Sequence, residues 1–153
     1  MSIQSINPAT GAVIETFQAT TPQELEGALT DAQSAFHDWR RLPFATRAQN
    51  LVKAAALLRA RKADHARTMA LEMGKPVVQG EAEVEKCAWV CEYYAETSPG
   101  LLADKDVQAS GSRSWVGYEP LGTVLAIMPW NFPFWQVIRF LAPALMAGNT
   151  AVL

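Results

Sequence analysis

Cysteine and clustered positive charge are both scarce in this chain of 153 residues. The two cysteines, Cys87 and Cys91, lie four positions apart in a helical pattern, which matches neither a disulfide framework nor a CxxC metal site. We expect both thiols to be reduced and buried, and the protein to be cytoplasmic. The net charge of −2 provides no basic surface, so we expect no nucleic-acid partner.

Long apolar runs, glycine-rich phosphate loops and metal-ligand spacings are missing as well. No segment approaches the roughly 20 apolar residues of a membrane span, so we expect no membrane partner. Neither GxGxxG nor GxxxxGK[ST] occurs, and a dinucleotide would therefore have to bind without these loops. We expect no metal site, and we expect His37 and His65 to be isolated surface residues on helices.

The first two thirds of the chain carry clear start and stop signals. Residues 5–14 alternate around a turn and predict a β-hairpin. Residues 21–24 (TPQE) form a capping box with proline at the first helical position, which predicts that a helix begins at Pro22. A second, long helix is predicted from about Phe44 to a left-handed cap at Gly74, and a third over residues 78–96.

The composition changes after residue 107, because the last 47 residues contain only three charged side chains: Arg113, Glu119 and Arg139. Residues 114–118 predict a strand with one polar face, and residues 122–128 predict a parallel strand that is covered on both faces. A helix is expected from Pro133 to Gly148, followed by another buried strand at residues 150–153. This β-helix-β pattern predicts an α/β fold that needs further strands, so we expect the chain to be incomplete.

The segment IMPWNFPFWQ, residues 127–136, raises the main functional question, because it places an amide between two prolines at the end of the predicted parallel strand. Ligands bind at the carboxyl ends of such strands, and the prolines would stiffen the loop around Asn131. Its amide could stabilise an oxyanion. Alternatively, Asn131 could cap the following helix, and spacing alone does not separate these two roles.

Arg139 is the only charged residue between Pro120 and the last position of the chain. A cation in so apolar a segment is costly unless an anion meets it, so we expect a partner. The partner could be a carboxylate elsewhere in a larger fold or the anionic group of a ligand, and the sequence leaves both open.

Three segments together resemble the aldehyde dehydrogenase superfamily: EPLGTV at residues 119–124, IMPWNFP at residues 127–133, and APALMAGNT at residues 142–150. Residues 7–11 (NPATG) and 71–76 (LEMGKP) extend the similarity over nearly the whole chain. The resemblance implies the N-terminal part of that α/β fold. It divides the chain into N-terminal, oligomerisation-associated hairpin strands (1–20), the helical part of the cofactor domain (21–106), and the truncated start of a Rossmann-like sheet (107–153).

The resemblance also implies residue roles. In the family, the amide at the position of Asn131 holds the aldehyde oxygen as it becomes negatively charged. The positions of Ile127, Met128, Pro129 and Trp130 form the wall that contacts the adenosine and pyrophosphate of NAD or NADP. Members that oxidise succinate semialdehyde, which this chain resembles most, use an arginine at the position of Arg139 to hold the substrate carboxylate.

The family's chemistry implies NAD(P)-dependent oxidation of a small, carboxylate-bearing aldehyde to an acid by a homo-oligomer. A cysteine thiolate attacks the aldehyde to give a thiohemiacetal and then a thioester, and a glutamate activates the water that releases the acid. Neither motif occurs in this chain, and Cys87 and Cys91 lie outside the nucleophile motif. The alternative is therefore a catalytically inactive fragment that at most binds nucleotide or associates with intact subunits.

Overall fold

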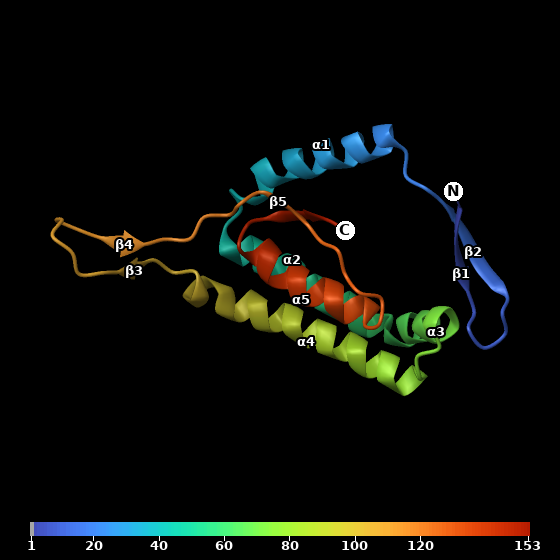
Figure 1. The fold of residues 1–153 in the computed structure, drawn as a ribbon. Coiled ribbons are helices and arrows are strands. Elements are labelled where there is room, and N and C mark those ends of the chain that lie inside the picture. Colours follow the sequence, from blue (N-terminus) through green and yellow to red (C-terminus); the bar gives the residue numbers. More distant parts are fainter. Residues whose placement is uncertain (1) are drawn as a thin grey trace.

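The computed structural model describes residues 2–153, in which a layer of packed helices carries a short parallel sheet (Figure 1). Helices α2 (Phe44–Ala60), α4 (Val77–Leu101) and α5 (Pro133–Met146) pack against one another, and α3 (Lys62–Met73) packs on α4. Their shared core consists of small and apolar side chains: Leu51, Ala55, Ala88, Cys91, Ala142 and Met146.

Two antiparallel hairpins project from opposite ends of this helical layer (Figure 1). Strands β1 (Ser2–Ile6) and β2 (Val13–Gln18) form the first hairpin, which confirms the predicted one. Its turn is closed by the Asn7 side chain, which accepts a hydrogen bond from the Ala9 amide at 2.9 Å. Strands β3 (Lys105–Asp106) and β4 (Trp115–Val116) form the second hairpin, so the predicted strand at residues 114–118 is confirmed but shorter.

The predicted helix signals at both ends of the N-terminal helical region are confirmed. Helix α1 (Pro22–Trp39) starts with a capping box, in which Glu24 accepts from the Thr21 amide at 2.8 Å and donates its own amide to the Thr21 hydroxyl at 3.2 Å. Gly74 ends α3 with φ of +72°, a conformation that glycine adopts without the steric penalty of a Cβ.

The predicted single helix over residues 44–74 is wrong, because the chain bends at Arg61 and forms α2 and α3. Apolar residues keep their helical spacing through the bend, so their pattern contains no sign of it. The bend accompanies tertiary contacts: Arg59, before it, and Lys62, after it, both pair with Glu85 of α4. Both α2 and α3 therefore pack along α4.

The predicted end of the third helix is also wrong, because α4 continues to Leu101 instead of stopping near Glu96. Pro99 lies in its final turn, where the amide of Leu102 still bonds to the carbonyl of Ser98 at 3.0 Å. A proline within the last turn removes one donor and leaves the following turn able to close.

Strands β5 (Thr123–Leu125) and β6 (Thr150–Val152) precede and follow α5 in the chain and pair with each other in parallel. This pairing confirms the β-helix-β unit and the α/β fold class. Helix α1 packs on this pair, and α5 contacts β6. The buried Asn149 side chain fixes the register, since its oxygen accepts from the amides of Leu121 at 2.7 Å and Gly122 at 3.1 Å.

The prediction that residues 122–128 are covered on both faces does not hold within residues 2–153. The strand is shorter than predicted, and the side chains of Leu125 and Ile127 are 69% and 84% exposed. One face of the strand end is therefore open to ligands or to further protein. The three-part division of the chain at residues 20 and 106 stays a prediction.

Candidate active site at the end of strand β5

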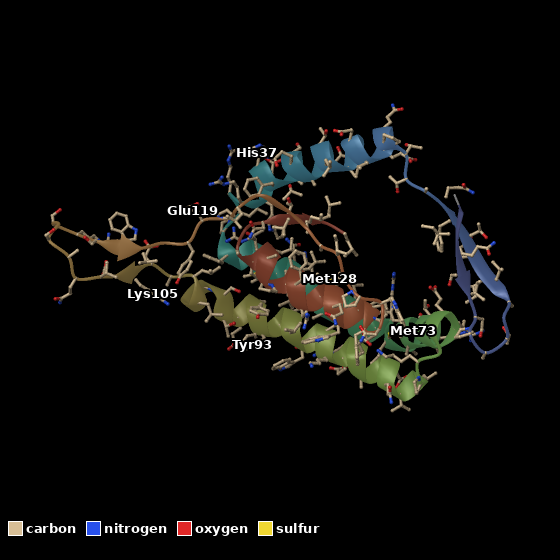
Figure 2. All side chains as sticks on the ribbon, in the orientation of Figure 1. His37, Met73, Tyr93, Lys105, Glu119 and Met128 are labelled. Carbon is tan, nitrogen blue, oxygen red and sulfur yellow. The ribbon has the colours of Figure 1, made fainter. Side chains whose placement is uncertain are left out.

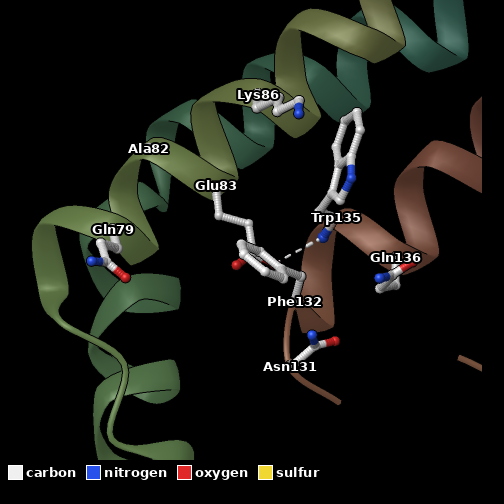
Figure 3. Close-up of a pocket in the computed structure, with 8 residues that line it drawn as sticks. All are labelled: Gln79, Ala82, Glu83, Lys86, Asn131, Phe132, Trp135 and Gln136. Carbon is white, nitrogen blue, oxygen red and sulfur yellow. Dashed lines mark hydrogen bonds between the residues drawn. The ribbon is translucent and has the colours of Figure 1, made fainter. Parts of the chain in front are cut away.

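The loop of residues 126–132 connects β5 to α5 and borders a cavity of about 590 Å³. Ala126 still belongs to the sheet, since its amide donates to the Val152 carbonyl at 2.9 Å. Beyond it, Pro129 and Pro133 restrict the backbone, and Pro133 occupies the first turn of α5. Side chains from α4, the loop and α5 line the cavity (Figure 3): Gln79, Ala82, Glu83, Lys86, Asn131, Phe132, Trp135 and Gln136.

Asn131 is exposed at this cavity, and its side chain makes no hydrogen bond to residues 2–153. The N-cap residue of α5 is Phe132, and its side chain forms no capping hydrogen bond to the helix. The alternative role of Asn131 as a helix cap is therefore not the one the chain adopts. Its carboxamide keeps a free N–H donor beside a cavity at the carboxyl end of a parallel strand.

Glu83 of α4 caps α5 instead. Its buried side chain accepts hydrogen bonds from the amides of Phe134 at 3.0 Å and Trp135 at 2.9 Å. Figure 3 shows the bond with Trp135. A carboxylate is stabilised there because the first amides of a helix lack partners within the helix and carry partial positive charge.

Lys75, directly after the Gly74 cap, neutralises this carboxylate. The two side chains form a buried ion pair, and the Lys75 ammonium also donates to the backbone carbonyl of Asn131 at 3.2 Å. The same ammonium lies 3.8 Å from the centroid of the Phe132 ring, close enough for a cation–π contact. Two sequence-distant residues, Lys75 and Glu83, thus hold the backbone that runs from the Asn131 carbonyl into α5.

Glu83 and Lys75 were not predicted as site residues from the sequence. A signal for Glu83 was present in the sequence, because it shares the buried stripe of α4 with Gly80, Val84 and Cys87, where a carboxylate needs a partner. Lys75 gave no comparable signal, because it follows a helix end where charged residues are common.

The four predicted cofactor residues lie together on the other side of the loop. Ile127, Met128, Pro129 and Trp130 line a hollow of about 430 Å³ that also touches the end of β6. Ile127 and Trp130 are 84% and 76% exposed, so they present a broad apolar wall at the strand ends. Such a wall fits the flat adenosine portion of a dinucleotide, which binds at this edge of an open α/β sheet.

Arg139 is exposed on α5, and no carboxylate of residues 2–153 lies within ion-pair distance of it. The expected partner is therefore not found in the described part of the chain. Arg139 is not a lining residue of the cavity, but it follows the lining residues Trp135 and Gln136 by four and three positions, so it shares their side of the helix. The side-chain oxygen of Gln136 is itself buried without a hydrogen-bond partner in residues 2–153.

Cys87 and Cys91 are free and buried, as predicted, and burial raises the pKa of Cys87 to about 12 and that of Cys91 to about 11. The thiolate is the reactive form, and a thiol with a pKa of about 12, such as Cys87, is ionised at pH 8 in roughly one molecule in ten thousand.

We therefore expect brief treatment of the native full-length protein with iodoacetamide at pH 8 to leave both cysteines unmodified. Peptide mass spectrometry checks this, with the urea-unfolded protein as the control that should be labelled at both; rapid labelling of either in the native protein would contradict the assignment.

The two histidines take no part in the site. His37 is exposed on α1 (Figure 2), whereas His65 is partly covered and packs on the Phe134 ring at 4.7 Å between centroids. Among residues 2–153, no three His, Cys, Asp or Glu side chains come together as metal ligands do. No helix of that stretch combines the length and apolarity required to cross a bilayer.

Comparison with known proteins places this geometry in a family. The chain is 52% identical over 153 residues to a probable NADP-dependent succinate-semialdehyde dehydrogenase of Synechocystis, covering 100% of this chain and 34% of that protein. It is 47% identical over 156 residues to succinate-semialdehyde dehydrogenase [NADP(+)] 1 of Mycobacterium tuberculosis, again covering 100% and 34%. The chain thus corresponds to the N-terminal third of these curated relatives.

Solved structures agree with the sequence comparison. Succinic semialdehyde dehydrogenase from Streptococcus pyogenes, solved in complex with NADP+, superposes with a TM-score of 0.93 at 32% identity, over 98% of this chain and 33% of that one. An aldehyde dehydrogenase from Brucella melitensis superposes with a TM-score of 0.92 at 33% identity, over 99% and 32%. The model of the aldehyde dehydrogenase family matches residues 1–153. With the whole chain matched, and with the fold confirmed as the N-terminal part of that family's fold, this protein belongs to the aldehyde dehydrogenase family.

Proposed function

We propose that this chain is the N-terminal third of an enzyme that oxidises succinate semialdehyde to succinate with NADP or NAD as the hydride acceptor. The observation that carries the proposal is the unbonded Asn131 carboxamide beside a 590 Å³ cavity at the end of β5. The NADP-dependent succinate-semialdehyde dehydrogenases among the relatives support both the substrate and the cofactor.

Asn131 has the chemistry of an oxyanion donor. Its amide N–H would donate to the aldehyde oxygen and bind it more tightly as negative charge develops during nucleophilic attack. The donor needs little reorganisation during the reaction, because the loop is held by two prolines and by contacts from α3–α4 residues. The attacking thiolate and the base that activates water would come from the polypeptide beyond this third.

Ile127, Met128, Pro129 and Trp130 would hold the adenosine half of the cofactor against the apolar wall at the strand ends. The bound cofactor would supply the hydride acceptor for this oxidation. Arg139 would bind the distal carboxylate of the substrate, since its guanidinium has no other anion in residues 2–153 and lies one turn beyond the cavity-lining Trp135. A succinate semialdehyde molecule would then have its two polar ends matched by Asn131 and Arg139. A homo-oligomeric state stays a prediction.

The proposal predicts turnover by the full-length protein and none by this third alone. Purified full-length protein should reduce NADP+ on addition of succinate semialdehyde, measured by the absorbance of the reduced nicotinamide, with NAD+ assayed in parallel. The isolated 153-residue chain is the control, and we expect no reduction because it lacks the nucleophile and base. A pure, folded full-length protein that reduces neither cofactor with succinate semialdehyde would contradict the proposal.

A further inference from the structure

The Lys75–Glu83 ion pair is the most deeply buried pair of opposite charges in residues 2–153. The side chains of Lys75 and Glu83 are 6% and 2% exposed, whereas the side chains of the other ion pairs are at least 37% exposed. Taking two charges out of water is unfavourable unless good geometry and additional hydrogen bonds compensate for the lost hydration. The additional bonds of this pair therefore indicate what the pair holds in place.

All of the additional hydrogen bonds converge on the segment that carries Asn131. The Lys75 ammonium donates to the backbone carbonyl of Asn131 at 3.2 Å, and the side chain of this same residue faces the cavity. Glu83 accepts from the amides of Phe134 and Trp135, three and four residues later. The peptide backbone is thus fixed from the Asn131 carbonyl to the first turn of α5, directly C-terminal to the Cα that carries the Asn131 side chain.

Within residues 2–153, no other side chain forms a hydrogen bond to the backbone of residues 131–135. Asn131 itself is unbonded beyond its carbonyl, and the N-terminus of α5 has no cap of its own. If only helix stability were required, a polar residue at the N-cap would satisfy the same amides locally. Here the bonds come instead from α4 and from the residue that precedes it.

We propose that Lys75 and Glu83 are positioning residues that fix the direction of the Asn131 carboxamide and thereby control the rate of the chemical step. This inference rests on the proposed role of Asn131. Both act through the main chain: the Lys75 ammonium bonds to the Asn131 carbonyl, and the Glu83 carboxylate, although it lines the cavity, is bonded to Lys75 and to two amides of α5. Displacing a catalytic group by about 1 Å can lower a rate by roughly 100-fold, so loss of either positioning residue should appear in kcat.

The experiment uses the full-length protein with Glu83→Gln and Lys75→Met, singly and together. Each single change should lower kcat by about tenfold or more, because Asn131 is no longer held in the productive direction. KM for succinate semialdehyde and the Kd for NADP+ should stay within about twofold, since the Glu83 oxygens are already bonded within the protein and neither residue belongs to the apolar wall. The double variant covers the case in which one unpaired buried charge prevents folding, because it removes both charges together.

Arg59→Met is the matched control. Arg59 is paired with Glu85 and Glu92 between α2 and α4, and none of these three residues lines the cavity. Its loss should lower the Tm and leave kcat unchanged, so a general effect of breaking interhelical ion pairs would be recognised in this variant.

A second readout separates positioning from stability. In an Asn131→Ala background, Lys75→Met or Glu83→Gln should lower kcat no further, because the group that they position is absent. Equal losses with and without Asn131, or no loss of kcat in the folded variants, would overturn the positioning role alone. A fully active Asn131→Ala variant would instead overturn the proposed function of Asn131, and with it this inference.

Discussion

Replacing Asn131 with alanine in the full-length protein is expected to lower kcat by about 100- to 1,000-fold, the usual effect of removing one oxyanion donor. The reason is that the carboxamide is the free polar donor that the β5–α5 loop offers to the cavity, and its interaction strengthens only as charge develops on the aldehyde oxygen. Initial rates at saturating succinate semialdehyde and NADP+ provide the measurement.

The same variant should fold normally and bind nucleotide. Asn131 is exposed and its side chain bonds to no described residue, so truncation should change the Tm little, and the apolar wall at residues 127–130 is untouched. Asn131→Asp is the sharper companion, because it keeps the shape but replaces the donor with an acceptor. If either variant retained more than about half of the kcat, the oxyanion role would have to be abandoned.

Replacing Arg139 with alanine should raise KM for succinate semialdehyde by about 10- to 100-fold, the range expected for loss of a hydrogen bond between charged groups. The structure supports this, because Arg139 has no carboxylate partner in residues 2–153 and follows the cavity-lining Trp135 by one helical turn. The measurement is the full dependence of rate on substrate concentration for the variant and the parent protein.

Two comparisons control the Arg139 experiment. Butanal, an uncharged aldehyde of similar length, should show almost the same KM in variant and parent, because it has no carboxylate to lose. Arg67→Ala removes an exposed arginine of α3 and changes the net charge equally, so it should leave both substrates unaffected. Equal increases of KM for both aldehydes after Arg139→Ala would show that the side chain does not recognise the carboxylate.

Local signals predicted the beginnings and ends of several elements well, because a few neighbouring residues determine them. The capping box at Thr21 and the glycine cap at Gly74 depend on side chains within one turn, and both are observed. The parallel pairing of β5 with β6 also followed from a short apolar strand, a helix and a second apolar strand.

The mispredicted boundaries depend on contacts between distant segments. The bend at Arg61 accompanies ion pairs of Arg59 and Lys62 with Glu85, which lies more than twenty residues away. Apolar spacing reports which side of a helix is buried, and it continues unchanged across such a bend. The exposure of Leu125 and Ile127 likewise depends on what covers the sheet, which strand composition alone does not specify.

The candidate site was predictable as a location but not as an assembly. The end of an apolar strand, two prolines and a polar residue indicated where Asn131 would lie, and it lies beside the cavity. The sequence could not show that Asn131 does not cap α5, because the residue that caps this helix, Glu83, lies 48 positions before Asn131 in the chain. A carboxylate on the buried face of a helix indicates that it has a partner, but the sequence does not identify that partner as the first turn of α5.

The oxyanion role of Asn131 is tested most directly by a crystal structure of the full-length protein with a covalent substrate adduct on its nucleophile. We expect the side-chain nitrogen of Asn131 to lie about 2.7–3.1 Å from the former aldehyde oxygen, within hydrogen-bond distance. A structure in which that oxygen is held by other donors, with the Asn131 amide turned away from it, would contradict the central claim.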